Sequence, residues 1–327
     1  MRVLITGVSG FAGSHLADFL LEQDDLEVWG TYRSGVGSAA HLTDRITLRQ
    51  IDLIDAEAVY ALLAECQPQR IYHLAGQAFV LVSWKDPWPT LENNIRPQLN
   101  VLQAMVDLNL DARILGVTSM KVYGQTGAKD LPIDELTPLR PDSPYAVSKL
   151  AQDMLCAQYF NSYGLITVRA RPFNHIGPRQ NDRFVASNFA KQIAEIECGL
   201  RAPVIHVGNL EAERDFTHVR DMVRAYYLLL EHGQPGEAYN LGQGEPNSIQ
   251  KLLDLLLTFS DIDIQVRIDP ARLRPSNVPV SYADISKLRA ATNWAPQISF
   301  EQSLRDVLEY WRQKITGRCH ENNRSTG

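Results

Sequence analysis

The chain has 327 residues, enough for two domains at roughly 100–200 residues each. Hydrophobic residues make up 45% and charged residues 21%, which excludes a disordered or fibrous chain. No apolar run approaches the roughly 18 residues of a membrane span, and a net charge of −6 argues against nucleic acid as the main partner. The cysteines (Cys66, Cys156, Cys198, Cys319) lack CxxC spacing, which favours a reducing cytoplasm and predicts no metal site.

The first half alternates short apolar runs with helical patterns. Candidate strands are residues 3–6, 26–32, 46–51, 71–75 and 114–118, and candidate helices cover about 15–23, 57–63 and 99–106. Strand and helix in alternation predict an α/β fold, a doubly wound parallel sheet with helices on both faces. The first run starts at once, so the N-terminus is expected to be a buried strand and not a signal peptide.

The second half is less regular and predicts a smaller α/β lobe. Candidate strands are 165–168, 204–207, 238–241 and 262–268, and candidate helices are 184–196 and a last one that Ser299 caps and that runs to about 315. We expect a nucleotide-binding domain at 1–172, to which 213–242 returns, and a discontinuous lobe within 173–315. The polar tail 316–327 is expected to fray.

A glycine pattern follows the first strand and opens a helix. Gly7, Gly10 and Gly13 have GxxGxxG spacing, with Phe11 inside it. Glycines allow a tight turn and let backbone N–H groups approach a pyrophosphate at the helix N-terminus. The pattern predicts dinucleotide binding at these four residues, although glycine turns also connect strand to helix for packing alone.

The end of the second strand indicates which dinucleotide binds. Arg33 stands where NAD-binding units usually carry an acidic residue for the ribose hydroxyls. An arginine favours the 2′-phosphate of NADP(H), while NAD(H) stays possible and a solvated loop residue is the alternative. Asp52, after the third strand, is a candidate for the adenine amino group, or simply an exposed turn residue.

A tyrosine and a lysine stand four residues apart at the start of a predicted helix. This spacing places Tyr145 and Lys149 on one face, where an ammonium lowers the pKa of a nearby phenol. Ser119 ends the strand 114–118, at the sheet edge where α/β folds place their sites. A serine there stabilises a substrate oxygen that gains charge; a strand-end cap is the alternative.

These motifs together resemble the extended short-chain dehydrogenase/reductase superfamily, which acts on nucleotide sugars. GxxGxxG, His73-Leu-Ala-Gly76, Asn94, Ser119 before Tyr123-Gly124, YxxxK and Arg171-Pro-Phe-Asn174 occur in that order. The resemblance covers the chain to about residue 315 and implies a Rossmann-type domain with a Ser119–Tyr145–Lys149 triad. It also implies that Lys149 holds the nicotinamide ribose. The further cofactor contacts that it implies are Leu53, Leu74, Ala75 and Gly76.

Motifs in the second half are similar to the GDP-mannose branch of that superfamily. The resemblance implies that Asn174, Arg214 and Arg274 contact the GDP moiety, with Lys191 and Val207 as further candidates. Fixed guanidinium groups bind a diphosphate in bidentate fashion, which agrees with this assignment. Taken singly, each charge is as readily a surface group or part of an ion pair.

The residues after Ser119 separate the reactions of this branch. Its 4,6-dehydratases carry an acidic residue there, whereas this chain has Met120 and Lys121. Elimination needs such an acid or base, so the expected reaction is NADPH-dependent reduction of the C4 ketone of GDP-4-keto-6-deoxy-D-mannose to GDP-D-rhamnose, with Tyr145 as proton donor. The alternatives are a nucleotide-sugar 4-epimerase, the dehydratase itself, and a catalytically silent sensor on this fold.

The helices 99–106 and 150–159 both look apolar enough to have a second buried face. In this superfamily such helices pair across a two-fold axis, so the resemblance implies a homodimer through a four-helix bundle. The alternative is that both faces pack inside one subunit.

Overall fold

The computed structural model describes residues 1–272 and 278–324, with side chains described through residue 317. The chain divides into two compact units. Unit 1 comprises Met1–Phe173, Met222–Leu241 and Ala283–Ala295, and unit 2 comprises Asn174–Asp221, Gly242–Tyr282 and Pro296–Gly327. Residues 213–221 thus belong to unit 2, unlike the sequence-based expectation, because their strand pairs within a unit 2 sheet. Residues 283–295 belong to unit 1, where their helix packs against strand β10.

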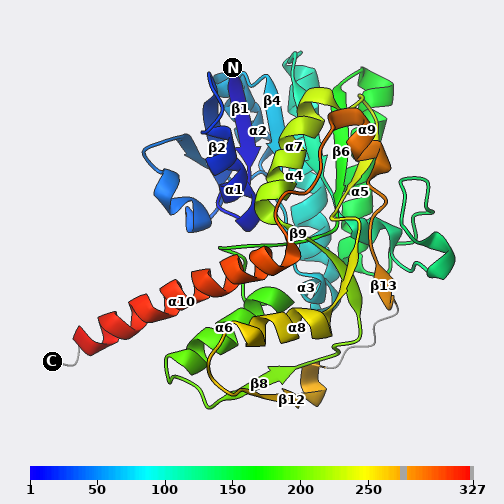
Figure 1. Cartoon of the computed structure of the whole chain (residues 1–327). Helices are drawn as coiled ribbons and strands as arrows, with labels where there is room; N and C mark the ends of the chain where they lie inside the picture. The colour runs from blue at the N-terminus through cyan, green and yellow to red at the C-terminus, as the bar shows by residue number, and fades with distance from the viewer. Residues whose placement is uncertain (273–277, 325–327) are drawn as a thin grey trace. The chain divides into compact units, whose positions relative to one another are not determined.

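Unit 1 is built on a seven-stranded parallel sheet in the order β10-β6-β5-β4-β1-β2-β3 (Figure 1). The strands are β1 (Arg2–Thr6), β2 (Glu27–Tyr32), β3 (Thr47–Gln50), β4 (Arg70–His73), β5 (Arg113–Val117), β6 (Ile166–Pro172) and β10 (Ala238–Leu241). The predicted doubly wound parallel sheet is confirmed. The strand order reverses between β1 and β4, and ligands of such sheets bind at the carboxyl ends of the strands near that point.

Helices cover this sheet and bury its apolar residues. They are α1 (Phe11–Leu20), α2 (Ala56–Cys66), α3 (Val80–Lys85), α4 (Pro87–Asp107), α5 (Pro144–Tyr163), α7 (Val219–His232, which starts in unit 2) and α9 (Ser286–Thr292), with 3₁₀ turns η1 (Gly37–Leu42), η2 (Met120–Tyr123) and η3 (Ala128–Asp130). One core joins Leu4, Ile71 and Ile114 of the sheet to α2, α4 and α5. Phe19 of α1 contacts Tyr227 of α7, with ring centroids 5.5 Å apart.

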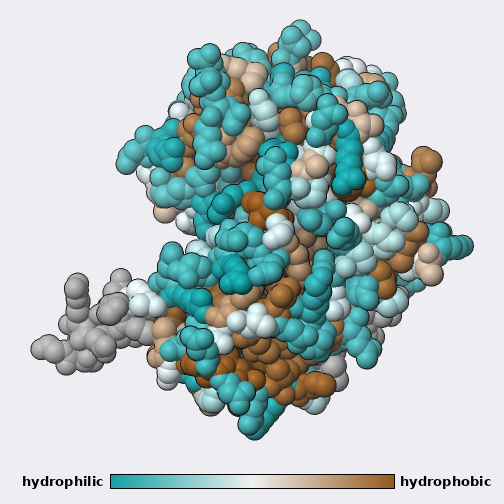
Figure 2. All heavy atoms as spheres, in the orientation of Figure 1, coloured by the Kyte–Doolittle hydropathy of each residue, from teal (hydrophilic) through white to brown (hydrophobic). Residues whose placement is uncertain are grey.

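Unit 2 has its own sheets and its own core. In one sheet β9 (Glu213–His218) pairs with β7 (Asn174–Ile176), β11 (Pro246–Ser248) and β13 (Val280–Ser281), and in the other β8 (Val204–Val207) pairs with β12 (Gln265–Ile268). A 3₁₀ turn, η4 (Pro270–Arg272), follows β12, and the core joins α6 (Val185–Glu197), α8 (Ile249–Thr258) and α10 (Phe300–Arg324). Figure 2 shows apolar surface where β8 and β12 lie, and the exposed side chains of this region include Leu200, Ile262, Val266 and Ile268.

The last helix continues past the expected end. α10 runs to Arg324, so the prediction of a frayed tail from residue 316 is wrong for 316–324. Once a helix is anchored by packing, each further residue adds one hydrogen bond without a new nucleation cost. Among the helices of the described residues, none is long and apolar enough to cross a membrane.

Candidate active site

The glycine turn between β1 and α1 leaves the backbone bare at the carboxyl edge of the sheet. Gly7 has φ +73°, and Gly10 precedes the helix with extended backbone. A Cβ on Gly13 would lie 2.4 Å from the Gly7 carbonyl oxygen, and one on Gly7 would lie 2.9 Å from the Ala75 Cα. The first-turn N–H groups of α1, from Phe11 on, lack intrahelical acceptors. This geometry fits a pyrophosphate bound at the helix N-terminus.

The ends of β2 and β3 place three further predicted cofactor residues, Arg33, Asp52 and Leu53. Arg33, after β2, is exposed and donates from Nη1 to Asn93 Oδ1 at 2.6 Å. Asp52, after β3, is exposed, and its Oδ1 accepts from the Ile54 N–H at 3.1 Å. The Leu53 side chain belongs to the unit 1 core, which leaves its backbone as the part able to face a ligand.

The segment after β4 is held close to β1 and α4. Leu74 N–H donates to the Thr6 carbonyl at 3.3 Å, and Ala75 N–H donates to Thr6 Oγ1 at 3.2 Å. Gly76 has φ +155°, and a Cβ there would lie 2.8 Å from Asn94 Oδ1 and 3.8 Å from Lys149 Nζ. Gly76 thus lies beside the predicted catalytic lysine, and its lack of a side chain leaves room there.

The structure brings Ser119, Tyr145 and Lys149 together. Ser119 follows β5 and caps η2, accepting from the Lys121 N–H at 3.2 Å. Ser143 caps α5 by accepting from the Ala146 N–H at 3.2 Å, so Tyr145 lies in the first helical turn. Tyr145 is hydrogen-bonded to Ser119, and Lys149 Nζ donates to the Val117 carbonyl at 3.1 Å.

Burial is the largest cause of the pKa shifts of Tyr145 and Lys149. It raises the pKa of Tyr145 to about 12, although the hydrogen bond with Ser119 lowers it. Burial also lowers the pKa of Lys149 to about 8. The prediction that Tyr145 has a lowered pKa is therefore wrong, because desolvation of the phenolate outweighs the hydrogen bond with Ser119. Tyr226 of α7 is a further buried phenol that interacts electrostatically with Tyr145.

The unit 2 candidates form one group around β9. Asn174 Nδ2 donates to the Asp215 carbonyl at 3.2 Å, and Arg214 Nη1 donates to the carbonyls of Glu213 and Pro279 at 2.7 and 3.0 Å. The buried Asp215 carboxylate accepts from the Gln243 and Gly244 N–H groups at 2.6 and 3.0 Å. Asp215, which sequence reasoning did not assign to the site, thus braces the strand that carries Arg214.

The remaining predicted substrate residues lie elsewhere. Lys191 of α6 forms an ion pair with Asp182 at 2.6 Å. An ion pair is the alternative to substrate binding for this residue. The Val207 side chain is fully buried in the unit 2 core, and its carbonyl accepts from the Asp269 N–H at 2.9 Å, so its side chain does not face a ligand. Arg274 lies outside the described residues.

The fold defines an α/β protein of the doubly wound class that binds dinucleotides. The chain belongs to the extended short-chain dehydrogenase/reductase family of NAD(P)-dependent epimerases and dehydratases, and the family model described as GDP-mannose 4,6 dehydratase matches residues 4–307. It is an NAD(P)-dependent enzyme that modifies nucleotide sugars.

Several relatives cover nearly the whole chain. GDP-6-deoxy-D-mannose reductase of Pseudomonas aeruginosa is 36% identical over 96% of this chain and 98% of its own. GDP-mannose 4,6-dehydratase of Yersinia enterocolitica is 29% identical over 94% of this chain and 92% of its own. Among solved structures, the Pseudomonas aeruginosa RMD complex with NADPH matches with TM-score 0.85 and 35% identity, covering 96% of this chain and 99% of that one. The NAD complex of Thermus thermophilus UDP-glucose 4-epimerase matches with TM-score 0.85 and 30% identity, covering 95% and 99%.

Proposed function

We propose that the protein reduces the C4 ketone of GDP-4-keto-6-deoxy-D-mannose to GDP-D-rhamnose with NADPH. The observation that carries this proposal is the group of Ser119, Tyr145 and Lys149, in which the tyrosine and the lysine are buried and the serine is half-buried. Met120 and Lys121 follow Ser119 in the sequence. This site can deliver one proton to an oxygen, but the two residues after Ser119 carry no carboxyl group for an elimination. The reductase from Pseudomonas aeruginosa named above supports the same reading.

The proposed chemistry divides simply among the residues. When bound, NADPH would supply the hydride that C4 of the sugar receives. The Tyr145 hydroxyl gives its proton to the C4 oxygen, and the Ser119 hydroxyl stabilises the charge that develops on that oxygen. Lys149 lies one turn from Tyr145, so its ammonium stabilises the phenolate until solvent returns the proton. The turn at Gly7, Gly10 and Gly13, with Arg33, Asp52 and the segment Leu74–Gly76, would hold the cofactor.

Recognition of the nucleotide is proposed for unit 2. Asn174 and Arg214 both donate to backbone carbonyls of the braced strand β9, and partial burial lowers the pKa of the Arg214 guanidinium. A guanidinium binds phosphate oxygens through charge-assisted hydrogen bonds. Arg274 is proposed as a second diphosphate contact on the resemblance alone.

The test is NADPH consumption with freshly prepared GDP-4-keto-6-deoxy-D-mannose, with the product identified by NMR. Oxidation of NADPH with formation of GDP-D-rhamnose is expected, and a GDP-6-deoxy-talose product would contradict the stereochemistry at C4. No oxidation of NADPH or NADH would overturn the proposal. NAD that co-purifies tightly, together with 4-epimerisation of a nucleotide sugar, would then identify a 4-epimerase. Conversion of GDP-mannose itself would identify the dehydratase.

We also propose a cytoplasmic homodimer. α4 and α5 pack against each other within the chain, yet Leu99, Val147 and Met154 on these helices remain 37%, 45% and 41% exposed. Apolar side chains on adjacent helices are suited to a four-helix bundle with a second copy.

A further inference from the structure

A carboxylate is buried on the helix that carries the catalytic tyrosine and lysine. Tyr145, Lys149 and Asp153 follow one another at four-residue intervals, so they share one face of α5. The Asp153 side chain is 0% exposed. Nothing in the proposed chemistry uses it, although it lies one turn from Lys149.

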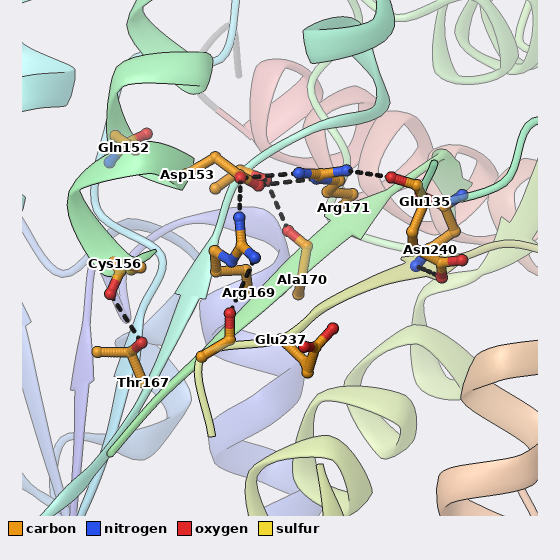
Figure 3. A network of polar contacts seen from close by, with 12 residues as sticks. Glu135, Gln152, Asp153, Cys156, Thr167, Arg169, Ala170, Arg171, Glu237 and Asn240 are labelled. Atoms are coloured by element: carbon orange, nitrogen blue, oxygen red, sulfur yellow. Dashed lines mark hydrogen bonds and ion pairs between the residues drawn. The ribbon is translucent and has the colours of Figure 1, made fainter. Parts of the chain in front are cut away.

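Two arginines of strand β6 hold this carboxylate. Arg171 donates from Nε to Oδ2 at 2.8 Å and from Nη2 to Oδ1 at 2.9 Å, and Arg169 Nη1 donates to Oδ1 at 2.7 Å. Figure 3 shows both guanidinium groups extending to Asp153. Thr118, the residue before Ser119, donates from Oγ1 to the Ala170 carbonyl at 2.9 Å and lies 3.4 Å from Asp153 Oδ2. Asp153 therefore fixes α5 against the ends of both β5 and β6.

The same arginine reaches the turn that Ser119 opens. Arg171 Nη1 donates to the Tyr123 hydroxyl at 3.0 Å, and that hydroxyl donates to Asn240 Oδ1 at 2.7 Å. Tyr123 is the last residue of η2, whose N-cap is Ser119. Burial by itself lowers the pKa of Arg171, but its bonds to Asp153 raise that pKa overall, so the guanidinium stays charged.

Arg171 and Asn240 also hold the loop that leads from η2 to α5. The Glu135 carboxylate accepts from the Asn240 N–H at 2.7 Å, and the Glu135 carbonyl accepts from Arg171 Nη1 at 3.4 Å. The base of the loop is closed where Gln125 N–H donates to the Arg140 carbonyl at 3.4 Å. Both chain segments that carry the triad are thus tied to one pair, Asp153 and Arg171.

We propose that Asp153 is a positioning residue that sets the hydrogen bond between Ser119 and Tyr145. A buried ion pair is a poor source of stability, because desolvation of both charges offsets their attraction. Its specific contribution is geometry, since a bidentate pair fixes both distance and orientation. This inference rests on the proposed function only in that the hydroxyl pair it aligns is the proposed catalytic one.

The test compares Asp153→Asn, which keeps the shape of the side chain, with Glu231→Gln. Glu231 binds Arg70 in bidentate fashion at 2.8 and 3.1 Å at the other end of the sheet, and it serves as the matched control. With NADPH and the keto sugar, Asp153→Asn is expected to lower kcat roughly 10²-fold while KM for NADPH is unchanged, because misplacement of about 1 Å has that cost.

The pH profile gives a readout that a purely structural role would not move. Reduction needs Tyr145 protonated, so activity falls as pH rises through its pKa. The bond from Ser119 lowers this pKa, so its loss in Asp153→Asn moves the alkaline limb to higher pH. Lys149, one turn along α5, and Tyr226 of α7, which interacts electrostatically with Tyr145, are unchanged in the Asp153→Asn protein. Glu231→Gln is expected to leave kcat and the alkaline limb of the pH profile unchanged.

A second readout needs no substrate and separates this inference from the proposed function. In the protein labelled with ¹³Cζ-tyrosine, the Tyr145 resonance is assigned by its absence in Tyr145→Phe. It is expected to shift in the same direction in Asp153→Asn as in Ser119→Ala, and to stay in place in Glu231→Gln. A lower Tm with kcat, pH profile and Tyr145 resonance all unchanged would overturn the inference. If Asp153→Asn does not fold, Thr118→Val provides the test, with a smaller shift in the same direction expected and no shift contradicting it.

Discussion

Tyr145 is the side chain on which the proposed chemistry depends, and its burial makes it a weak acid. Its pKa of about 12 keeps the hydroxyl protonated at neutral pH, the form that a reduction needs. Tyr145→Phe is expected to lower kcat/KM for reduction by roughly 10²–10⁴-fold, the usual contribution of general acid catalysis, while NADPH affinity is retained. Stopped-flow reduction and fluorescence titration with NADPH measure the two quantities. Comparable loss of NADPH affinity would instead show that the hydroxyl is needed to bind the cofactor.

Arg33 is the residue on which the proposed preference for NADPH depends. Its guanidinium is exposed and bonded to Asn93 Oδ1, so it is available to a 2′-phosphate at low desolvation cost. Arg33→Ala is expected to weaken NADPH binding about tenfold and to leave NADH binding unchanged, since one charge-assisted contact is lost. Arg49→Ala is the control, because Arg49 is a neighbouring arginine that pairs with Glu65. Equal losses of affinity for NADPH and NADH would show that Arg33 does not contact the 2′-phosphate.

His73 makes the stability of unit 1 depend on pH. It is completely buried, and burial together with the charge of Lys149 lowers its pKa to about 3. In the unfolded chain its pKa is about 6.5, so below that pH the unfolded state binds a proton that the folded state does not bind. The free energy of unfolding is therefore expected to fall by about 1.4 kcal/mol per pH unit below 6.5. Urea unfolding at pH 7 and pH 5 measures this, and a slope unchanged in His73→Gln would contradict the assignment.

At the scale of single elements, the glycine turn is the segment where backbone shape decides whether the proposed pyrophosphate site can form. A Cβ on Gly13 would meet the Gly7 carbonyl oxygen at 2.4 Å, whereas one on Gly35 would meet nothing within 4 Å among the described residues. Gly13→Ala is expected to cost roughly 1–3 kcal/mol of stability and to impair NADPH binding, because β1 and α1 must move apart. Gly35→Ala is expected to leave Tm and NADPH affinity unchanged. Identical behaviour of the two variants would show that the turn relaxes freely.

Sequence patterns predict elements best where one local rule acts alone. The strands β8 and β10 match their predicted ranges, because turn residues on both sides keep these runs too short for a helix. α4 begins at Pro87, whereas the predicted helix begins at residue 99. Pro97 lies inside the observed helix, and a proline within a sequence normally indicates that a helix does not continue through it. Packing against α2 and α5 overrides that local signal.

The candidate site shows the same division between local and distant contacts. The glycines, Ser119, Tyr145 and Lys149 follow from spacing. The structure places Ser119 in hydrogen-bond contact with Tyr145, one turn before Lys149 on α5. The pKa of Tyr145 does not follow from spacing, because it depends on burial by residues distant in the chain. Asp153 was missed for a similar reason: its partners Arg169 and Arg171 lie on another strand. Its place four residues after Lys149 was the one available signal.

For the whole molecule, the exposed apolar side chains of α4 and α5 predict how two copies associate. Val147 and Met154 stand seven residues apart on α5 and are 45% and 41% exposed, while Leu99 of α4 is 37% exposed. Because 7 residues make about two helical turns, the two α5 side chains share a face. An aspartate at both positions would leave charges buried without partners in a two-fold bundle, which costs several kcal/mol.

The double variant Val147→Asp/Met154→Asp is therefore expected to be a monomer of 36.8 kDa where the unaltered protein has twice that mass. Light scattering after size-exclusion chromatography measures the mass, and circular dichroism checks that each variant is folded. Tyr60→Asp is the matched control, because Tyr60 is 44% exposed on α2, outside this face, so its charge should leave the dimer intact. A monomeric unaltered protein, or a double variant that stays dimeric, would show that these helices do not form the interface. Since α5 also carries Tyr145, Lys149 and Asp153, the monomer's kcat then shows whether association supports the site that this helix positions.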